Sequence, residues 1–257
     1  MCQEADLRKK EEKEEEEYKM KVIKNTKEEF AFASEMSESM ANAIRRSALE
    51  IPVLAVDEVE FYKNDSVIYD EVLALRLGLL PLHIEKLKME EECKCSGKGC
   101  SKCTIQLKLS AKGPGYIFAK ELKGSAKPVY PDIPIAYLDD KQELELVAFA
   151  RLGQGTKHTK YAPGLIYYRH VPEIEGNKKN PEVIKRYPAG ILKFEGNEVK
   201  FVDKYACDFY DSEKKSDFSI VPGKELLFCV ESWGQMSAKE IFLEAIAALK
   251  DNLKEVK

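Results

Sequence analysis

The stretch "NAIRRSALEIPVLAVDEVEFYKNDSVIYDEVLALRLGLLPL", Asn42–Leu82, carries the signals of a helix, a long strand and a second helix in close succession. The first helix must stop at Ile51, because the residue before a proline avoids the helical region and proline cannot donate the next hydrogen bond. In "LAVDEVEF" the apolar alternation changes parity near Asp57 and Glu58. This slip predicts a β-bulge in the strand.

Turn residues divide the rest of this stretch. "KND", residues 63–65, predicts a turn after the strand. A short apolar helix is expected from Asp70, and Gly78 followed by Pro81 supplies its C-terminal stop. Beyond it, "TIQLKLS" (104–110) and "LELVAFARL" (144–152) read as strands. This middle section is therefore predicted to be mostly sheet and loop.

Upstream, "KVIKNTKEEFAFA" predicts two short strands around a turn at Asn25, and Ser34 is a plausible N-cap for the helix that follows. That helix has an apolar face made of Met36, Met40, Ala43, Ile44 and Ala48. The preceding "EEKEEEEYK", residues 11–19, has almost no apolar face. Residues 1–19 are therefore expected to form a charged, disordered tail.

Two further elements are predicted towards the C-terminus. A polar region between Glu173 and Val221 holds two strands, "AGILKFEG" and "EVKFVD", separated at Gly196-Asn197. The chain then finishes with the strand "ELLFCVES" and a long helix, whose Ser237-x-x-Glu240 start has the form of a capping box. The apolar face of this helix consists of Phe242, Ala245, Ile246, Leu249, Leu253 and Val256.

Composition restricts the class of protein. A chain of 257 residues can bury a large core without covalent cross-links, and it has no run of eighteen apolar residues and no secretory signal. We therefore expect a cytoplasmic protein that does not enter a membrane. The net charge of −4 and the pI of about 5.7 argue against autonomous binding to nucleic acid, so any contact with DNA should be indirect.

Four of the seven cysteines lie within "CKCSGKGCSKC", residues 93–103, at the spacing C-x-C-x4-C-x2-C. A divalent cation would remove the mutual repulsion of four thiolates and fix a loop that has no core of its own. The glycines at 97 and 99 would let the backbone turn tightly, and the lysines at 94, 98 and 102 would offset the charge. The pattern predicts one structural Zn²⁺ per chain, closed to further ligands, bound by Cys93, Cys95, Cys100 and Cys103.

Three other uses of these cysteines remain open. Two disulfides are disfavoured by a reducing compartment and by the strain of bridging a C-x-C unit. An iron-sulfur cluster also takes four thiolates, but its common spacings differ. A redox-active Cys100-x-x-Cys103 would need a helix N-terminus to lower a thiol pKa, whereas a strand is expected to follow.

Motifs for catalysis are missing from the sequence. It contains no G-x-x-x-x-G-K-[ST] phosphate loop, and "GQG" at residues 153–155 reads as a turn. His83, His158 and His170 each stand alone, without a second histidine at ligand spacing. Carboxylates form no recognisable acid and base pair. No active site is evident in this chain.

Asn42–Leu82 closely resembles the assembly-subunit signature of DNA-directed RNA polymerases, which the archaeal D subunit shares with the eukaryotic third-largest subunit and, more loosely, with bacterial alpha. "RLGQGTKHTKYAPG", residues 151–164, resembles that family's loop before the chain returns to the dimerisation domain. "ELLFCVESWGQMSAKEIFLEAI", residues 225–246, resembles its closing strand, turn and helix. The resemblance covers nearly everything from Met20 onward.

The resemblance implies an α+β fold with a discontinuous alpha-like dimerisation domain, here 20–54, 162–172 and 221–257. An inserted mainly-β domain, 55–161, would carry the zinc loop of residues 93–103. A small ferredoxin-like insert would occupy 173–220. Many archaeal members bind iron-sulfur clusters in that insert, but here it has Cys207 alone and Tyr187-Pro188 in place of a Cys-Pro pair, so no cluster is expected.

The resemblance also implies a role without catalysis, since the family's magnesium-binding aspartates lie in one of the large polymerase chains. The protein would pair with a small alpha-like partner, called L, as an obligate heterodimer, and the pair would form the platform for the two large polymerase subunits. The alternative function is a stand-alone zinc-ribbon-like nucleic-acid-binding protein, and a third is a thiol-disulfide enzyme. The residues expected at the partner interface are Met36, Met40, Ile44, Arg45, Arg46, Phe242, Ile246, Leu249 and Leu253.

Overall fold

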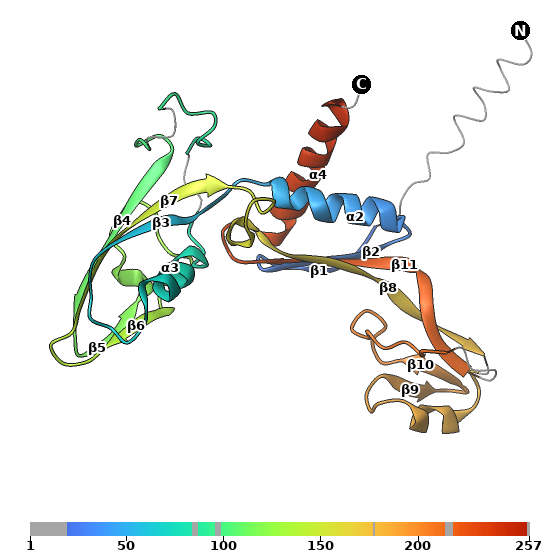
Figure 1. The fold of residues 1–257 in the computed structure, drawn as a ribbon. Helices are drawn as coiled ribbons and strands as arrows, with labels where there is room; N and C mark the ends of the chain where they lie inside the picture. The colour runs from blue at the N-terminus through green and yellow to red at the C-terminus, as the bar shows by residue number, and fades with distance from the viewer. Residues whose placement is uncertain (1–19, 84–86, 96–98, 177, 214–217, 256–257) are drawn as a thin grey trace, which may run out of the picture. The chain divides into compact units, whose positions relative to one another are not determined.

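The fold mixes α-helices and β-strands, as the sequence predicts (Figure 1). It is known from a computed structural model, which describes residues 20–83, 87–95, 99–176, 178–213 and 218–255. The tail expected at 1–19 lies outside the described residues. Contacts between residues divide the chain into two compact units. The first holds residues up to 24, 31–41 and 168–229, and the second holds 25–30, 42–167 and the residues from 230.

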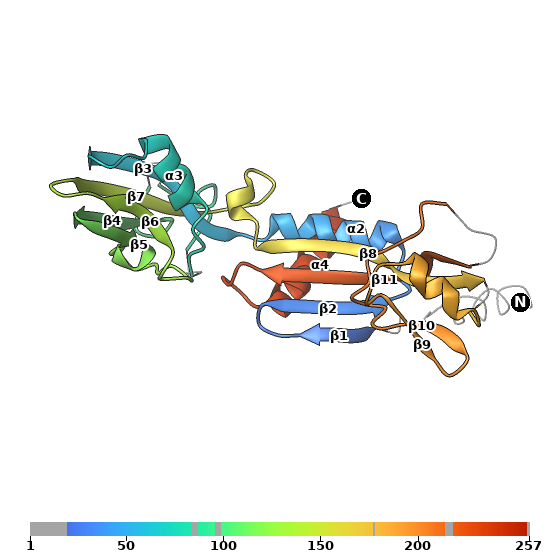
Figure 2. The same cartoon turned by 90° about the horizontal axis from the view of Figure 1, so that it is seen from below.

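Four strands form one sheet in the order β1-β2-β11-β8, and Figure 2 shows them side by side. Their bounds are β1 Lys21–Asn25, β2 Glu29–Ser34, β8 Gly164–Gly176 and β11 Phe218–Ser232. The turn expected at Asn25 lies just after that residue, which ends β1: the Thr26 N–H donates to the Glu29 carbonyl at 2.8 Å, and the Glu29 N–H donates to Thr26 Oγ1 at 2.9 Å. The strands of this sheet therefore come from three distant parts of the chain.

Helix α2 runs over Glu38–Ser47 and continues as the 3₁₀ helix η1, Ala48–Glu50. The prediction of Ser34 as its N-cap was wrong, because Ser34 is the buried last residue of β2. Ser37 takes that role, and its Oγ accepts from the Met40 N–H at 3.2 Å. The predicted stop is confirmed: Ile51, just before Pro52, is extended with φ −63° and ψ 124°.

A second, antiparallel sheet has the order β3-β7-β4. Its strands are β3 Val53–Asn64, β4 Thr104–Lys112 and β7 Glu143–Gly153. The predicted bulge is confirmed by a register shift between Val56 and Glu58. The turn predicted at 63–65 was placed too early: Lys63 and Asn64 still pair with β7, and Asn64 Oδ1 then accepts from the Ser66 N–H at 3.0 Å.

The core of this second sheet lies between the sheet and helix α3, Asp70–Gly78, which contacts β3 (Figure 1). Leu73 and Leu77 on α3 are fully buried. They join leucines that alternate along the strands, which are Leu54, Leu107, Leu109, Leu144 and Leu146. The period of two along each strand places these leucines on the same face of the sheet.

Smaller elements surround this sheet. Strands β5, Gly115–Phe118, and β6, Pro134–Leu138, pair with each other, and η2 covers Ala119–Glu121. The outer edge of β4 is paired at one point. Lys108 and Lys123 exchange two backbone hydrogen bonds of 2.8 Å each, so a single bridge covers the strand at its midpoint.

The region after β8 contains the two strands predicted there. They are β9, Leu192–Glu195, and β10, Glu198–Phe201, which pair antiparallel around the turn at Gly196. A 3₁₀ helix, η4, spans Pro181–Arg186. Together with the start of β11 these elements enclose a small core of their own, made of Val183, Tyr187, Leu192, Val199, Phe218 and Ile220.

Helix α4, Ala238–Glu255, begins with the predicted capping box. Ser237 Oγ accepts from the Glu240 N–H at 3.3 Å, and the Glu240 carboxylate accepts from the Ser237 N–H at 2.8 Å. The ring of Phe242 lies 5.5 Å from that of Phe30. No helix among the described residues is long and apolar enough to cross a membrane.

Candidate metal centre and subunit interface

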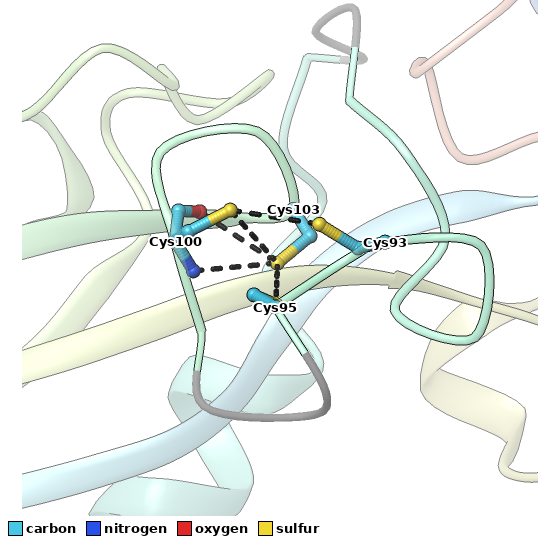
Figure 3. Close-up of side chains that lie close together, drawn as sticks. All are labelled: Cys93, Cys95, Cys100 and Cys103. Atoms are coloured by element: carbon cyan, nitrogen blue, oxygen red, sulfur yellow. Dashed lines mark hydrogen bonds between the residues drawn. The ribbon is translucent and has the colours of Figure 1, made fainter.

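The side chains of four cysteines point towards one another, and their sulfur atoms all lie within 4.8 Å of one another (Figure 3). These residues are Cys93, Cys95, Cys100 and Cys103. The Sγ–Sγ distances are 3.5 Å from Cys93 to Cys100, 3.6 Å from Cys95 to Cys103 and 3.8 Å from Cys100 to Cys103. A tetrahedral ion with metal–sulfur bonds of about 2.3 Å separates its ligands by about 3.8 Å. The cysteine set therefore fits one four-coordinate metal ion.

The local backbone explains how the four cysteines meet. Cys103 is buried and directly precedes β4, so the sheet fixes its position. Gly99 adopts φ +72°, a conformation that side-chain-bearing residues rarely take, and this turn brings Cys100 to the cluster. The Lys88 N–H donates to the Lys102 carbonyl at 2.9 Å, which ties the two ends of the loop together. Lys94 and Lys102 are exposed, while Gly97 and Lys98 lie outside the described residues.

Hydrogen bonds give two of the thiols different pKa values. The backbone N–H of Cys100 donates to Cys103 Sγ at 3.4 Å and lowers the pKa of that thiol to about 7. For Cys93 the backbone N–H of Cys95 lowers the pKa, but hydrogen bonds with the Cys100 and Cys95 sulfurs outweigh it and raise the pKa to about 11. The Cys103 thiol therefore loses its proton more readily than the Cys93 thiol. A divalent cation would let all four carry charge, and its binding would release protons.

A polar cluster that sequence reasoning missed lies at the bulge of β3. The carboxylate of Asp57 accepts from Lys160 Nζ and from the Tyr161 hydroxyl, each at 2.8 Å, and from Arg151 Nη1 at 3.0 Å. Arg151 also lies 3.5 Å from the Glu58 carboxylate. The bulge and "RLGQGTKHTKYAPG" were both visible in the sequence, but nothing there indicated that they meet.

The Asp57 cluster holds the segment by which the chain leaves β7. Burial raises the pKa of Asp57, but the hydrogen bonds from Lys160 and Tyr161 dominate and lower it to about 2. Burial and the bond to Asp57 raise the pKa of Tyr161. A Cβ on Gly153 would stand 2.6 Å from the Tyr161 ring, so only glycine lets that ring lie against the end of β7. Gln154 Nε2 donates to the Glu50 carbonyl at 2.9 Å and anchors the next turn.

The residues expected at the partner interface have different surroundings. Ile44 and Phe242 are buried within this chain, at 6% and 8% exposure. Met40 and Leu253 are 49% and 63% exposed. Arg46 is exposed as well, whereas the remaining four are half-buried, namely Met36, Arg45, Ile246 and Leu249. Val256, the last residue of the predicted stripe, lies outside the described residues.

The apolar side of helix α4 becomes more exposed towards its C-terminal end. Ile241, Phe242 and Ala245, in its first two turns, are buried. The same side continues through half-buried Ile246 and Leu249 to exposed Leu253. Asn252 Nδ2 donates to the Glu50 carboxylate at 2.8 Å, and Leu253 beside it stays uncovered. The apolar side of the helix thus extends beyond what the described residues of this chain cover.

Comparison with known proteins identifies the family. Residues 59–167 match the family described as the RNA polymerase Rpb3/RpoA insert domain. DNA-directed RNA polymerase subunit Rpo3 of Methanothermobacter thermautotrophicus is 37% identical over 234 residues, which are 84% of this chain and 88% of that protein. Rpo3 of Pyrococcus horikoshii is 34% identical over 248 residues, 90% of this chain and 93% of that protein.

A third relative covers still more of the sequence. Rpo3 of Archaeoglobus fulgidus is 30% identical over 258 residues, 95% of this chain and 94% of that protein. The relatives give no support to the alternative of a stand-alone nucleic-acid-binding protein. They confirm the resemblance that the sequence showed. The chain belongs to the archaeal Rpo3 family, the D subunits of DNA-directed RNA polymerase.

Proposed function

We propose that this chain, as an assembly subunit of a DNA-directed RNA polymerase, forms an obligate heterodimer with the small alpha-like partner L. The pair would present the platform on which the two large subunits assemble, and DNA would be contacted only through the complete enzyme. The observation that carries the proposal is the uncovered apolar side of α4, which ends in Leu253 at 63% exposure. A stripe of this kind is an expected site of contact with another protein.

Helix α2 offers a second part of the same interface. Met40 is 49% exposed, while Ile44, one turn later, is buried, so α2 is anchored by one side chain and leaves the other uncovered. Arg46 adds an exposed charge at the end of the helix. Obligate interfaces of this type bury roughly 2,000 Å² or more and resemble a domain core cut in half.

We also propose the domain division that the family resemblance implies. The dimerisation domain would comprise 20–54, 162–172 and 221–257, the inserted mainly-β domain 55–161, and the small ferredoxin-like insert 173–220. The sheet β1-β2-β11-β8 supports the first of these, because its strands lie mainly in those three separate ranges. The independent small core around Val199 and Tyr187 supports the last. We place the protein in the cytoplasm together with its polymerase.

The test of the partner is coexpression with the small alpha-like subunit of the same organism, followed by gel filtration. A 1:1 heterodimer is expected. Leu249→Asp combined with Leu253→Asp should abolish it, because two carboxylates would lose their water in an apolar interface. The matched control is Leu243→Asp with Ala247→Asp, two exposed positions on another side of the same helix. A stable free monomer whose double variant still binds with unchanged affinity would overturn the proposal.

We further propose that Cys93, Cys95, Cys100 and Cys103 bind one structural Zn²⁺, and that the region of Cys207 holds no iron-sulfur cluster. The support is the set of sulfur distances, which suits a closed tetrathiolate. Protein purified without chelator should contain about one zinc per chain and be colourless under anaerobic conditions. Less than a tenth of that zinc, with four titratable thiols in the folded protein, would refute the metal centre.

A further inference from the structure

The metal loop has neighbours outside the four cysteines. Thr104, the first residue of β4, has its Oγ1 3.6 Å from Cys103 Sγ. Arg151 lies directly opposite Thr104 in the register of β4 and β7, and its Nε donates to the same hydroxyl oxygen at 3.4 Å. A threonine hydroxyl that accepts from arginine keeps its own proton free to donate. The three groups therefore form a chain from guanidinium to hydroxyl to sulfur.

Arg151 is held firmly in this position. Its side chain is only 18% exposed, and it bonds to Asp57 at 3.0 Å and lies 3.5 Å from Glu58. The loop comes close on the other side: a Cβ on Gly99 would lie 3.3 Å from Thr104 Oγ1 and 3.9 Å from Arg151 Nη2. Gly99, Cys100, Thr104 and Arg151 line one cleft of about 540 Å³. The guanidinium thus stands between the carboxylates of β3 and the thiol cluster.

Charge explains why such an arrangement is useful. Four thiolates around a divalent cation leave two net negative charges, and hydrogen bonds or cations just outside the ligands stabilise them and orient the sulfur atoms. The loop lysines Lys94 and Lys102 are exposed, so water screens them. Arg151, by contrast, has a side chain that is only 18% exposed, and its Nε reaches the Thr104 hydroxyl beside the cluster.

We propose that Thr104 and Arg151 are positioning residues of the metal centre. The Thr104 hydroxyl donates to the Cys103 thiolate, and Arg151 orients that hydroxyl and offsets the charge of the centre. Because Arg151 is also bonded to Asp57, retention of the metal is linked to the junction formed with Lys160 and Tyr161. This inference rests on the proposed metal centre, and its test separates the two.

The test measures zinc affinity of the full chain, coexpressed with its partner, by competition with a chromophoric chelator. Thr104→Val, which keeps the shape and removes the hydroxyl, and Arg151→Met should each weaken binding by about 10- to 100-fold. Thr104→Ser should restore affinity close to that of the wild type. The matched controls are Lys102→Met, which removes an exposed charge beside Cys103, and Ser110→Ala, which removes an exposed hydroxyl further along β4. Both should bind as the wild type does.

A spectroscopic measurement distinguishes positioning from general loosening of the fold. In the cobalt-substituted protein, loss of a hydrogen bond to a thiolate should shift the sulfur-to-metal charge-transfer band to lower energy in Thr104→Val but not in Thr104→Ser. Wild-type zinc affinity and an unshifted band in Thr104→Val and Arg151→Met would overturn the inference. A wild-type chain that binds no metal would instead overturn the metal centre itself.

Discussion

The hydroxyl of Tyr161 donates to the carboxylate of Asp57 at 2.8 Å, although the two residues are 104 positions apart in the sequence. Lys160 and Arg151 bond to the same carboxylate. The carboxylate of Asp57, at the bulge of β3, therefore holds together the segments by which the chain enters and leaves the sheet β3-β7-β4. The bulge matters because it turns Asp57 out of the strand's regular alternation.

The pKa of about 2 at Asp57 gives this junction a defined pH dependence. Since that pKa lies below the ordinary value of 3.8, the junction contributes its stability above about pH 4 and loses it as the pH falls towards 2. Asp57→Asn should therefore lower the free energy of unfolding at pH 7, and the difference from the wild type should shrink between pH 4 and pH 2. Urea unfolding at several pH values measures this. Exposed Asp132→Asn, which removes only a surface ion pair with Lys120, is the control and should change the free energy of unfolding little.

A substitution at Gly153 tests how closely the Tyr161 ring packs against the end of β7. Gly153→Ala places a methyl group 2.6 Å from a ring that cannot move without breaking its bond to Asp57. We expect a loss of about 1–3 kcal/mol in the free energy of unfolding, as for other overpacked sites. Gly78→Ala is the matched control, since its methyl group would make only ordinary contacts at 3.6 Å or more. Equal stability of the two variants would show that the ring does not press on Gly153.

Cysteine substitutions and metal removal test whether the metal centre stabilises only its own loop. Cys103→Ser should lower the zinc content well below one per chain, whereas Cys207→Ser, at a buried cysteine elsewhere, should leave it unchanged. Chelation should increase hydrogen exchange in residues 87–95 and 99–104 while the centre of β7 stays protected, because the core of leucines does not depend on the loop. Uniform loss of protection over the whole sheet would contradict a local role.

The start of α4 controls the helix on which the partner is proposed to bind. Ser237→Ala removes the acceptor for the Glu240 N–H and should cost about 1 kcal/mol of stability. Ser237→Thr keeps a hydroxyl and should cost little. Thermal unfolding of the heterodimer measures both variants. A Ser237→Ala protein as stable as the wild type would mean that contacts with Phe30, and not the cap, fix the first turn.

Local signals in the sequence predicted local structure well. The stop at Ile51, the bulge at Asp57 and the capping box at Ser237 each depend on a few neighbouring residues, and each is confirmed. The gathering of the cysteine sulfurs follows in the same way from close spacing. The N-cap failed because Ser34 and Ser37 are chemically alike, and only the end of β2 decides between them.

Long-range contacts could not be predicted in this way. Thr104 and Arg151 meet because β4 and β7 pair in one register, and a shift by one residue would separate them. Lys160 and Tyr161 bond to Asp57 although strands β4 and β7 lie between them in the sequence. Exposure is also a property of the assembled chain. The stripe on α4 has one spacing throughout, yet Phe242 is buried and Leu253 is not.

The bridge between Lys108 and Lys123 has a consequence for the life of the protein before assembly. An open strand edge offers unpaired N–H and C=O groups to any passing chain, and such edges promote aggregation. Here both backbone groups of Lys108 are already taken by Lys123. A newly made chain that waits for the rest of its polymerase therefore cannot extend this sheet through a second copy at that point without first giving up two hydrogen bonds.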